Sequence, residues 1–265
     1  LLDRGAYGGA QPHIAPTYIK EIPFPIELIA HEVEISDQVK KSRHLSKESE
    51  GDYMRAADLL ESELGLDKLR FDKPIGYTTR SSDLVLSRRN DSQHYEPRFS
   101  KLLTHLSNFQ STPIRDIRSY NRRGVQPSYF KKGTHAVLNS RHLGPRHIKY
   151  DELQLTSKSA FEASPEAHIQ QNDLLIYTTG AYIGRTNIYL DTSPALASNH
   201  VNILRLSHKI DPAYMAIVFQ TIVGQFQTQK HARGSAQAEL YPSDIDKFKK
   251  QVLKDWCYID KEGNL

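Results

Sequence analysis

The stretch Gly234-Ser-Ala-Gln-Ala-Glu-Leu-Tyr-Pro-Ser-Asp-Ile245 decides how the chain is interpreted, because a related phrase stands near its start. That phrase is Gly8-Gly-Ala-Gln-Pro-His-Ile-Ala-Pro-Thr-Tyr-Ile19, and the two align without a gap. Similar phrases at a fixed offset indicate a repeated structural unit, although a chance match of turn-rich segments is an alternative. With the flanking residues included, the identical pairs are Ala6/Ala232, Gly8/Gly234, Ala10/Ala236, Gln11/Gln237, Pro16/Pro242 and Ile19/Ile245.

The repeat predicts two domains of one kind. Residues 1–25 would be the tail of a first domain whose body is expected to precede Leu1. A length of 265 residues with 38% apolar residues suits one large or two ordinary domains with real cores.

Cysteine and histidine usage restricts the chemistry. The single cysteine, Cys257, excludes an intrachain disulfide and a cysteine-rich zinc site. His142 and His147 lie in a basic, turn-rich stretch without nearby carboxylates, so we expect them to face solvent or phosphate rather than a metal. No signal-peptide pattern or membrane-length apolar run is present, which predicts a cytoplasmic location.

Charge is distributed unevenly behind a net value of +4. Residues 26–67 are acidic, whereas residues 115–149 contain a single acid, Asp116, among many cations and several aromatic residues. This mixture is typical of a surface that meets phosphates and bases. The cations of the basic segment are Arg115, Arg118, Arg122, Arg123, Lys131, Lys132, Arg141, Arg146 and Lys149.

A long helix is predicted over residues 26–65. Pro23 and Pro25 mark its start, and Gly65 is a natural end. The polar residues 46–52 could bend or interrupt it. A narrow apolar stripe on an acidic helix indicates packing against one partner helix. The stripe includes Ile29, Val33, Ala56 and Leu60.

Residues 66–252 are predicted to form an α+β domain with a curved mixed sheet and flanking helices. Strands are expected at 83–87, 136–139, 173–178, 183–190 and 201–206. Helices are expected at 97–109, with Leu102, Leu103 and Leu106 inward, and from Asp211-Pro212 to near Gln229. Ser243 is expected to cap a final helical turn.

Familiar catalytic motifs are absent. There is no Walker phosphate loop, dinucleotide fingerprint, adenine-clamping tetrapeptide of amino-methyltransferases or Gly-x-Ser-x-Gly elbow. The nearest nuclease-like group, Asp244-Ile-Asp-Lys247, is better explained as a charge-capped helix. We therefore predict no catalytic residue, no metal and no cofactor.

Several segments together resemble one family, in order and spacing. They are Arg89-Asn-Asp-Ser-Gln-His-Tyr-Glu-Pro97, Gly124-Val-Gln-Pro-Ser-Tyr129 with Ala136-Val-Leu-Asn-Ser-Arg141, Asp173-Leu-Leu-Ile-Tyr-Thr-Thr-Gly-Ala-Tyr-Ile-Gly-Arg185, and the Gly-Ser-Ala-Gln237 phrase. The chain resembles the DNA-specificity (S) subunit of Type I restriction-modification systems. That family has two target-recognition domains, each followed by a long helix, with the two helices packed antiparallel as a spacer.

The resemblance implies a layout and partners. Residues 1–25 would end a first recognition domain, 26–65 would form the spacer helix and 66–252 a second recognition domain. Residues 253–265 are too short for a second spacer helix, so they would be its truncated start or this chain would lack one. The implied partners are double-stranded DNA, DNA adenine methyltransferase subunits and a restriction subunit.

The function predicted from the residues and the resemblance is non-catalytic, sequence-specific DNA recognition. All cations of the basic segment except Arg141 are expected to hold phosphates. The residues predicted to read bases are Asn139, Arg141, Tyr182, Arg185 and Gln237. The alternatives are a metal-dependent nuclease or DNA-modifying enzyme that uses Asp151, Glu152, Asp244 and Asp246, and a non-specific nucleic-acid binder with stacking tyrosines.

Overall fold

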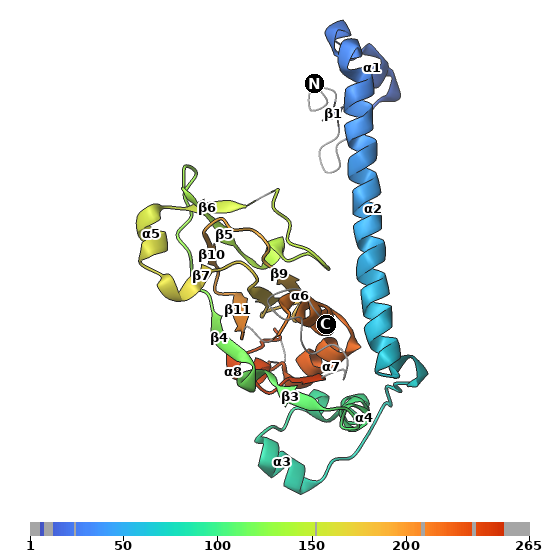
Figure 1. Cartoon of the computed structure of the whole chain (residues 1–265), viewed down its shortest axis with the longest axis vertical. Coiled ribbons are helices and arrows are strands. Elements are labelled where there is room, and N and C mark those ends of the chain that lie inside the picture. The colour runs from blue at the N-terminus through green and yellow to red at the C-terminus, as the bar shows by residue number, and fades with distance from the viewer. Residues whose placement is uncertain are drawn as a thin grey trace, which may run out of the picture. The chain divides into compact units, whose positions relative to one another are not determined.

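A computed structural model describes residues 6–7, 13–23, 25–151, 153–207, 210–234 and 237–251 (Figure 1). Contacts divide the chain into two units, Leu1–Asp52 and Tyr53–Leu265. The boundary lies inside the longest helix, so the end of that helix belongs with the second unit. Glu152 and the tail at 253–265 lie outside the described residues.

The first unit begins with a small hairpin. Strand β1 (Ala6–Tyr7) pairs antiparallel with β2 (His13–Ile14), and the short helix α1 (Pro16–Glu21) follows with a proline in its first turn. A 3₁₀ helix, η2 (Ile26–His31), leads into the long helix α2 (Glu32–Glu63).

The long helix α2 is continuous. It runs through residues 46–52 without interruption, so the expected break is absent, and at ~1.5 Å per residue it is about 48 Å long. Gly65 ends it in the left-handed region, at a φ of 64° where a side chain would be strained. The helix itself is as predicted, except that its first six residues, Ile26–His31, form a 3₁₀ helix.

Two four-stranded sheets form the centre of the second unit, where the sequence predicted a single curved sheet. The antiparallel sheet has the order β4 (Arg118–Arg123), β11 (Val201–Leu206), β8 (Leu174–Tyr177), β9 (Thr186–Ile188). The mixed sheet has the order β6 (Gln154–Thr156), β5 (His135–Leu138), β10 (Ala195–Ala197), β7 (His168–Ile169). Its parallel pair is β5 with β10.

Helices and short strands surround these sheets. The α-helices are α3 (Ser81–Ser87), α4 (Pro97–Leu106), α5 (Lys158–Glu162), α6 (Pro212–Gln220), α7 (Ile222–His231) and α8 (Pro242–Ile245). The 3₁₀ helices are η3 (Leu66–Lys68), η4 (Ser92–Tyr95), η5 (Ile114–Asp116), η6 (Ser140–His142) and η7 (Pro165–Ala167). Strand β3 (Ser111–Pro113) pairs with β12 (Lys249–Gln251).

Alternation along the central strands explains the layers. Leu174 and Ile176 of β8 face a core shared with α6 and α7, whereas Leu175 faces the mixed sheet. In β11, Leu204 turns to the helices and Ile203 to the sheet. Successive side chains of a strand point to opposite faces, and a sheet covered on both faces carries unbroken apolar runs.

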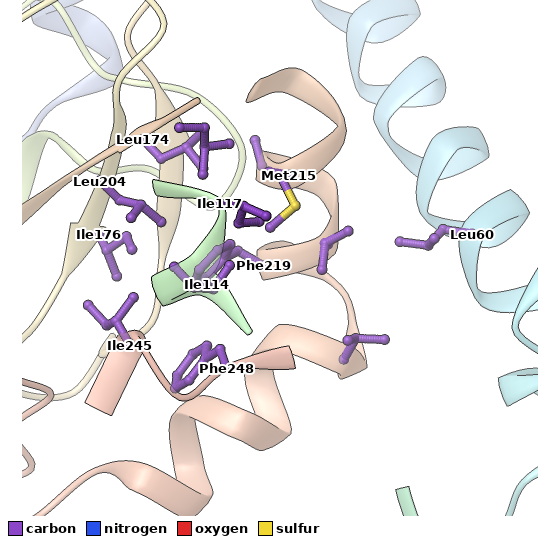
Figure 2. Close-up of a cluster of buried hydrophobic side chains, with 14 of the residues drawn as sticks. Leu60, Ile114, Ile117, Leu174, Ile176, Leu204, Met215, Phe219, Ile245 and Phe248 are labelled. Carbon is purple, nitrogen blue, oxygen red and sulfur yellow. The ribbon is translucent and has the colours of Figure 1, made fainter. Parts of the chain in front are cut away.

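The larger core also takes in the end of α2. Leu60 is 3% exposed and belongs to the same cluster as Met215 and Phe219 of α6 (Figure 2). Glu61 accepts a hydrogen bond from the backbone N–H of Ile222, at 3.1 Å. The last turns of α2 are thereby fixed to the second unit.

Three local predictions were wrong. Residues 83–87 lie in the helix α3 rather than a strand, and Ser87 Oγ donates to the carbonyl of Asp83. The helix predicted from Asp211 to near Gln229 is broken at Thr221, whose extended backbone separates α6 from α7. Ser243 lies inside α8, and the residue at its N-cap position is Tyr241.

Candidate nucleic-acid interface

Polar segments meet at one end of the antiparallel sheet. Strand β4 ends there, β11 begins there and β8 ends there, because neighbouring strands alternate in direction. The backbone N–H of Gly124 donates to the carbonyl of Val201, and that of Thr178 donates to the carbonyl of His200.

The mixed sheet ends at the same place. The backbone N–H of Ser198, which follows β10, donates to the carbonyl of Leu138, the last residue of β5. Gly124 packs against the end of β10, where a Cβ on Gly124 would lie 2.1 Å from the carbonyl oxygen of Ala197. No residue larger than glycine fits there. The strand ends of both sheets are thus held together by backbone contacts.

A tight turn at residues 178–185 carries the most exposed aromatic–cation pair at this end. Gly180 and Gly184 have positive φ values, 110° and 86°, which shape the turn. The guanidinium carbon of Arg185 lies 3.6 Å from the ring centroid of Tyr182, whose side chain is 55% exposed. This distance is within the range of a cation–π contact.

The repeated phrase closes the turn. Arg233 and Glu239 pair antiparallel, and the backbone N–H of Gly180 donates to the carbonyl of Ala238. This brings the exposed Gln237 beside the turn, with its Nε2 within 3.9 Å of a Cβ built on Gly180.

Arg123 connects the same phrase to β4. Its Nη2 donates to the carbonyl of Leu240 at 2.9 Å, and its guanidinium lies 4.8 Å from the ring of Tyr241. Tyr241 donates to Glu239, a hydrogen bond that raises the pKa of the phenol and lowers the pKa of the carboxyl.

Arg141 and Arg146 follow β5 at this end. Arg141 is exposed and donates weakly to Gln154 Oε1, at 3.3 Å. The carbonyl of Arg146 accepts from Gln220 Nε2, which also donates to the carbonyl of Thr186, next to Arg185. Arg146 therefore lies close to the turn at 178–185. We call the following set the strand-end surface: Arg123, Arg141, Arg146, Tyr177, Tyr182, Arg185, His200, Gln237 and Tyr241.

Buried polar atoms without a hydrogen-bond partner gather beneath this surface. Within the described residues, they include Thr178 Oγ1, Thr179 Oγ1, Ser198 Oγ and Asn202 Oδ1. Buried polar atoms are normally satisfied, so such a group calls for water or a polar ligand.

Other predicted site residues serve the fold instead. Asn139 is 9% exposed, and its side chain caps η6 and donates to Gln154 at 2.8 Å. His142, expected to face solvent or phosphate, is buried because its Nδ1 completes this cap. Arg118 donates through two nitrogens to the carboxylate of Asp246.

The remaining predicted phosphate contacts are dispersed. Arg115 lies 3.4 Å from Asp116, and Arg122 is exposed on the edge strand β4. Lys149 is exposed after η6. Lys131 and Lys132 lie near the start of β5, where Thr134 bonds to Thr156, whereas Arg141 follows the end of β5.

Two of the four acids named for the nuclease alternative, Asp244 and Asp246, are already engaged. Asp244 is buried, and Arg233 and Lys247 donate to it at 2.8 and 2.9 Å. Although burial opposes ionisation, hydrogen bonds from Arg233 and Lys247 hold the pKa of Asp244 below its ordinary value. Arg118 and Asn121 act in the same way on Asp246. Neither carboxylate offers free oxygens to a metal.

The predicted helix-packing residues fall into two groups. Ile29 and Val33 are 53% and 72% exposed, whereas Ala56 is half-buried and Leu60 lies in the core of the second unit. The apolar stripe is thus not uniform, because its second half packs within the same domain.

Tyr177, His200 and Tyr241 were missed by the sequence prediction. The repeat did not indicate Tyr241, because the first copy has Ala15 at the equivalent position. His200 stands in a short turn between β10, a strand that the sequence did not predict, and β11.

Three solved structures are similar in arrangement. They are the Type I restriction-modification S subunit from M. genitalium, a chain from a study of complex assembly and conformational transition of the type I R-M system, and the HsdS subunit from Thermoanaerobacter tengcongensis. The chain is structurally similar to these proteins. The TM-scores are 0.36, 0.43 and 0.39, at 14%, 13% and 13% identity.

The matches cover 54%, 92% and 94% of this chain, and 33%, 52% and 54% of those proteins. The chain therefore spans between a third and about half of their lengths. Comparison with protein-family models and with curated proteins gives no match. Within the described residues, no helix has the length and apolarity needed to cross a membrane.

Proposed function

We propose that the chain is a non-catalytic subunit that recognises a specific sequence in double-stranded DNA and directs methyltransferase subunits to it. The observation that carries the proposal is the strand-end surface. Three sequence segments that resemble S-subunit motifs, at 124–141, 173–185 and 234–237, supply most of its residues although they are far apart in the chain.

The chemistry of this surface suits a nucleic acid. It presents four arginines, three tyrosines, a histidine and a glutamine from strand ends and from the loops that are anchored to them. Arginine reads the guanine edge through two hydrogen bonds, and glutamine reads adenine in the same manner. A surface with these donors can both hold phosphates and discriminate between bases.

We assign roles to the predicted residues from their exposure and from the hydrogen bonds that they make within the protein. We assign base reading to Arg141, Tyr182, Arg185 and Gln237, whose side chains project from turns. Arg122, Arg146 and Lys149 are assigned to phosphates. Asn139 and Arg118 are left out because their hydrogen bonds stabilise the fold.

The exposed part of the α2 stripe is assigned to assembly. Ile29, Val33, Ile35 and Val39 are each more than half exposed, an apolar content that suits a protein partner. The proposed partners are the DNA adenine methyltransferase subunits and a restriction subunit, as in the family that the sequence resembles.

The test is selection of bound duplexes from a random pool. For Arg185→Ala we expect a relaxed preference at one base pair, because a two-bond contact contributes about 1–3 kcal/mol of discrimination. Binding to unselected duplexes should persist. The matched control is Arg122→Ala, which should weaken all sequences about equally.

If the wild-type chain selects no duplex sequence, the proposal of a specificity function is wrong. Tighter binding to single strands than to duplexes would favour the non-specific binder instead. If the wild type selects a sequence but variants of Arg141, Arg185 and Gln237 all keep it, only the assignment of the base readers is wrong.

A further inference from the structure

The segment 89–97, which has no residue in the strand-end surface, joins the 3₁₀ helix η4 to the end of α7. Arg89 donates through Nη1 and Nη2 to two carbonyls at the end of α7, at 2.9 and 2.6 Å. His94 Nδ1 donates to the carbonyl of Lys230 at 2.7 Å, and Lys230 Nζ donates to the carbonyl of His94 at 2.9 Å. These reciprocal bonds fix the Lys230 side chain beside η4.

A cavity of about 790 Å³, open to solvent, adjoins this junction. Its volume is within the range of ~300–1,000 Å³ that is usual for small-molecule sites. Its wall combines side chains from the segment before α3, from α3 itself, from η4, from the start of α4 and from the end of α7. All of these elements belong to the second unit, so the cavity is formed within one unit.

Two cations in the cavity wall have no acidic partner. Lys230 is half-buried, and within the described residues its ammonium forms no ion pair and makes one hydrogen bond, although it has three donors. Arg80 is exposed at the N-cap of α3, and its guanidinium has no bonded partner in the same part of the chain. Asp83 is the single acid among the described residues of the wall.

The environment of Lys230 favours an anion. Burial, and then the nearby Arg89 guanidinium, lower the pKa of the Lys230 ammonium, whereas the charge of Arg89 itself is balanced by Asp91 at 2.6 Å. A cation that is partly withdrawn from water without a counter-ion is costly, and an opposite charge beside it removes that cost. A bound anion would therefore stabilise the charged form of Lys230.

Hydroxyl groups supply further donors in the wall. Thr78, Thr79 and Ser100 are exposed to the cavity, and the hydroxyl of Tyr95 lies 2.5 Å from Ser87 Oγ. A phosphoryl group has more acceptor oxygens than a carboxylate, so it can use more of these donors at once. Hydrogen bonds from cations to phosphate are also stronger than those between neutral groups.

We propose that this cavity binds a phosphoryl group, with Lys230 as its ion-pair partner and with Arg80 and the wall hydroxyls as further donors. The cavity is much larger than a phosphate ion, so the phosphoryl group belongs either to a small phosphate ester or to a DNA backbone. Either way it is an anion site separate from the residues of the strand-end surface. The segment 89–97 thereby gains a role that base reading does not give it.

The test is isothermal titration calorimetry of the whole chain in a buffer without phosphate. Ribose 5-phosphate is the ligand, and ribose is the control that lacks the phosphoryl group. The same proteins are titrated with a duplex of arbitrary sequence at several salt concentrations, which distinguishes a small ester from a DNA phosphate.

Two cavity variants and one control are compared with the wild type. Lys230→Gln retains a donor for the carbonyl of His94. Arg80→Gln changes an exposed side chain that bonds to no described residue, so folding should not be affected. The matched control is Lys132→Gln, at an exposed lysine outside the cavity wall.

We expect the wild type and Lys132→Gln to bind ribose 5-phosphate but not ribose. Lys230→Gln and Arg80→Gln should each bind the ester about tenfold more weakly, because each loses a charge-assisted hydrogen bond. If the phosphoryl group is that of DNA, the ester does not bind. Each cavity variant then lowers the salt slope of duplex binding by about 1 relative to Lys132→Gln.

The proposal is wrong if the ester binds no better than ribose and both cavity variants bind the duplex as Lys132→Gln does. It is also wrong if all three variants weaken the ester equally, since that would reflect net charge rather than a site. Neither result depends on the selection of a DNA sequence, so a failure of the recognition function would be seen separately.

Discussion

Two arginines on one strand differ in their interactions: one forms an ion pair within the fold and the other is exposed. The amino-acid composition does not reveal this difference. Arg118 and Arg122 both belong to β4, and the basic segment predicts phosphate binding for both. Yet Arg118 pairs with Asp246, whereas Arg122 is exposed. The partner of Arg118 is 128 residues away in the sequence, so only the fold reveals the pairing.

Replacement of these two residues should separate stability from binding. For Arg118→Ala we expect unfolding to become easier by about 1–2 kcal/mol, because the Asp246 carboxylate loses charge-assisted hydrogen bonds at a partly exposed site. For Arg122→Ala, stability should change by less than about 0.5 kcal/mol. The slope of the logarithm of the DNA-binding constant against the logarithm of the salt concentration should fall in magnitude by about 1. Urea unfolding and salt titration measure both, and equal stability losses would contradict the assignment.

Single buried histidines also make the stability of the fold depend on pH. His231 packs against the rings of Phe248 and His94, and burial lowers its pKa to about 3 from an ordinary 6.5. Burial also lowers the pKa of His94. The unfolded chain therefore binds protons that the folded chain excludes, so stability rises with pH in this range.

We expect the free energy of unfolding to fall as pH drops below about 6.5, by at most about 1.4 kcal/mol per pH unit for His231. His231→Phe should make this decline shallower. The exposed His147→Gln is the control and should leave the slope unchanged. Urea midpoints at pH 7, 6 and 5 provide the measurement, and a parallel decline in all three proteins would show that folding does not lower the pKa of His231.

At the scale of elements, the helix α2 contains two adjacent leucines whose exposed fractions differ widely. Leu60 is 3% exposed in the core of the second unit, whereas Leu59 is 44% exposed. Leu60→Ala should destabilise that unit by about 2–5 kcal/mol, since it leaves a cavity. Leu59→Ala should cost less than about 1 kcal/mol, as expected for an exposed position.

Thermal or urea unfolding of the two variants checks this prediction. Equal effects would mean that the end of α2 is not part of the core. The wider consequence is that the domain boundary does not coincide with the ends of the predicted helix.

Elements were predictable where one physical pattern dominated. The bounds of β11 were predicted correctly because four of its six residues are apolar, as is typical of a strand covered on both faces. Strand β4 was not predicted, because Arg118-Ser-Tyr-Asn-Arg-Arg123 lacks an apolar pattern and forms a strand only by pairing with β11. Helix α3 was mistaken for a strand because its short apolar run has no periodicity.

At the scale of the whole molecule, the fold divides the basic segment. Lys131 and Lys132 precede β5, whereas Arg141 and Arg146 follow it with the strand-end surface. A four-residue strand spans about 13 Å, so the two groups are separated by more than a side-chain contact. The net charge of the segment could be read from the sequence, but this division could not.

Paired neutralisation should distinguish the two groups. Arg141→Ala with Arg146→Ala should weaken duplex binding and reduce its salt slope by about 1, because Arg146 is the member of the pair assigned to a phosphate and each phosphate contact releases about one counterion. Lys131→Ala with Lys132→Ala should have a much smaller effect. Fluorescence anisotropy at several salt concentrations is the measurement. A larger loss from the lysine pair would place the DNA at the opposite end of β5.

The α+β class followed from the sequence, but the number of sheets did not. Strands β5 and β10 pair in parallel although 56 residues separate Leu138 from Ala195. Such a pairing depends on the intervening chain returning to the same place. The sequence therefore predicted the candidate site only as separate motifs. These motifs form one surface because the strand ends of the two sheets meet at the same place.

The backbone anchoring of the strand-end surface bears on how such a protein can change over generations. The turns that carry Tyr182, Arg141 and Gln237 are held by main-chain hydrogen bonds, which substitution of a side chain leaves in place. Mutations at these exposed positions can alter the preferred ligand without a matching repair in the core. The surface can therefore diversify rapidly, while Gly124, with no room for a methyl group, is expected to tolerate almost no substitution.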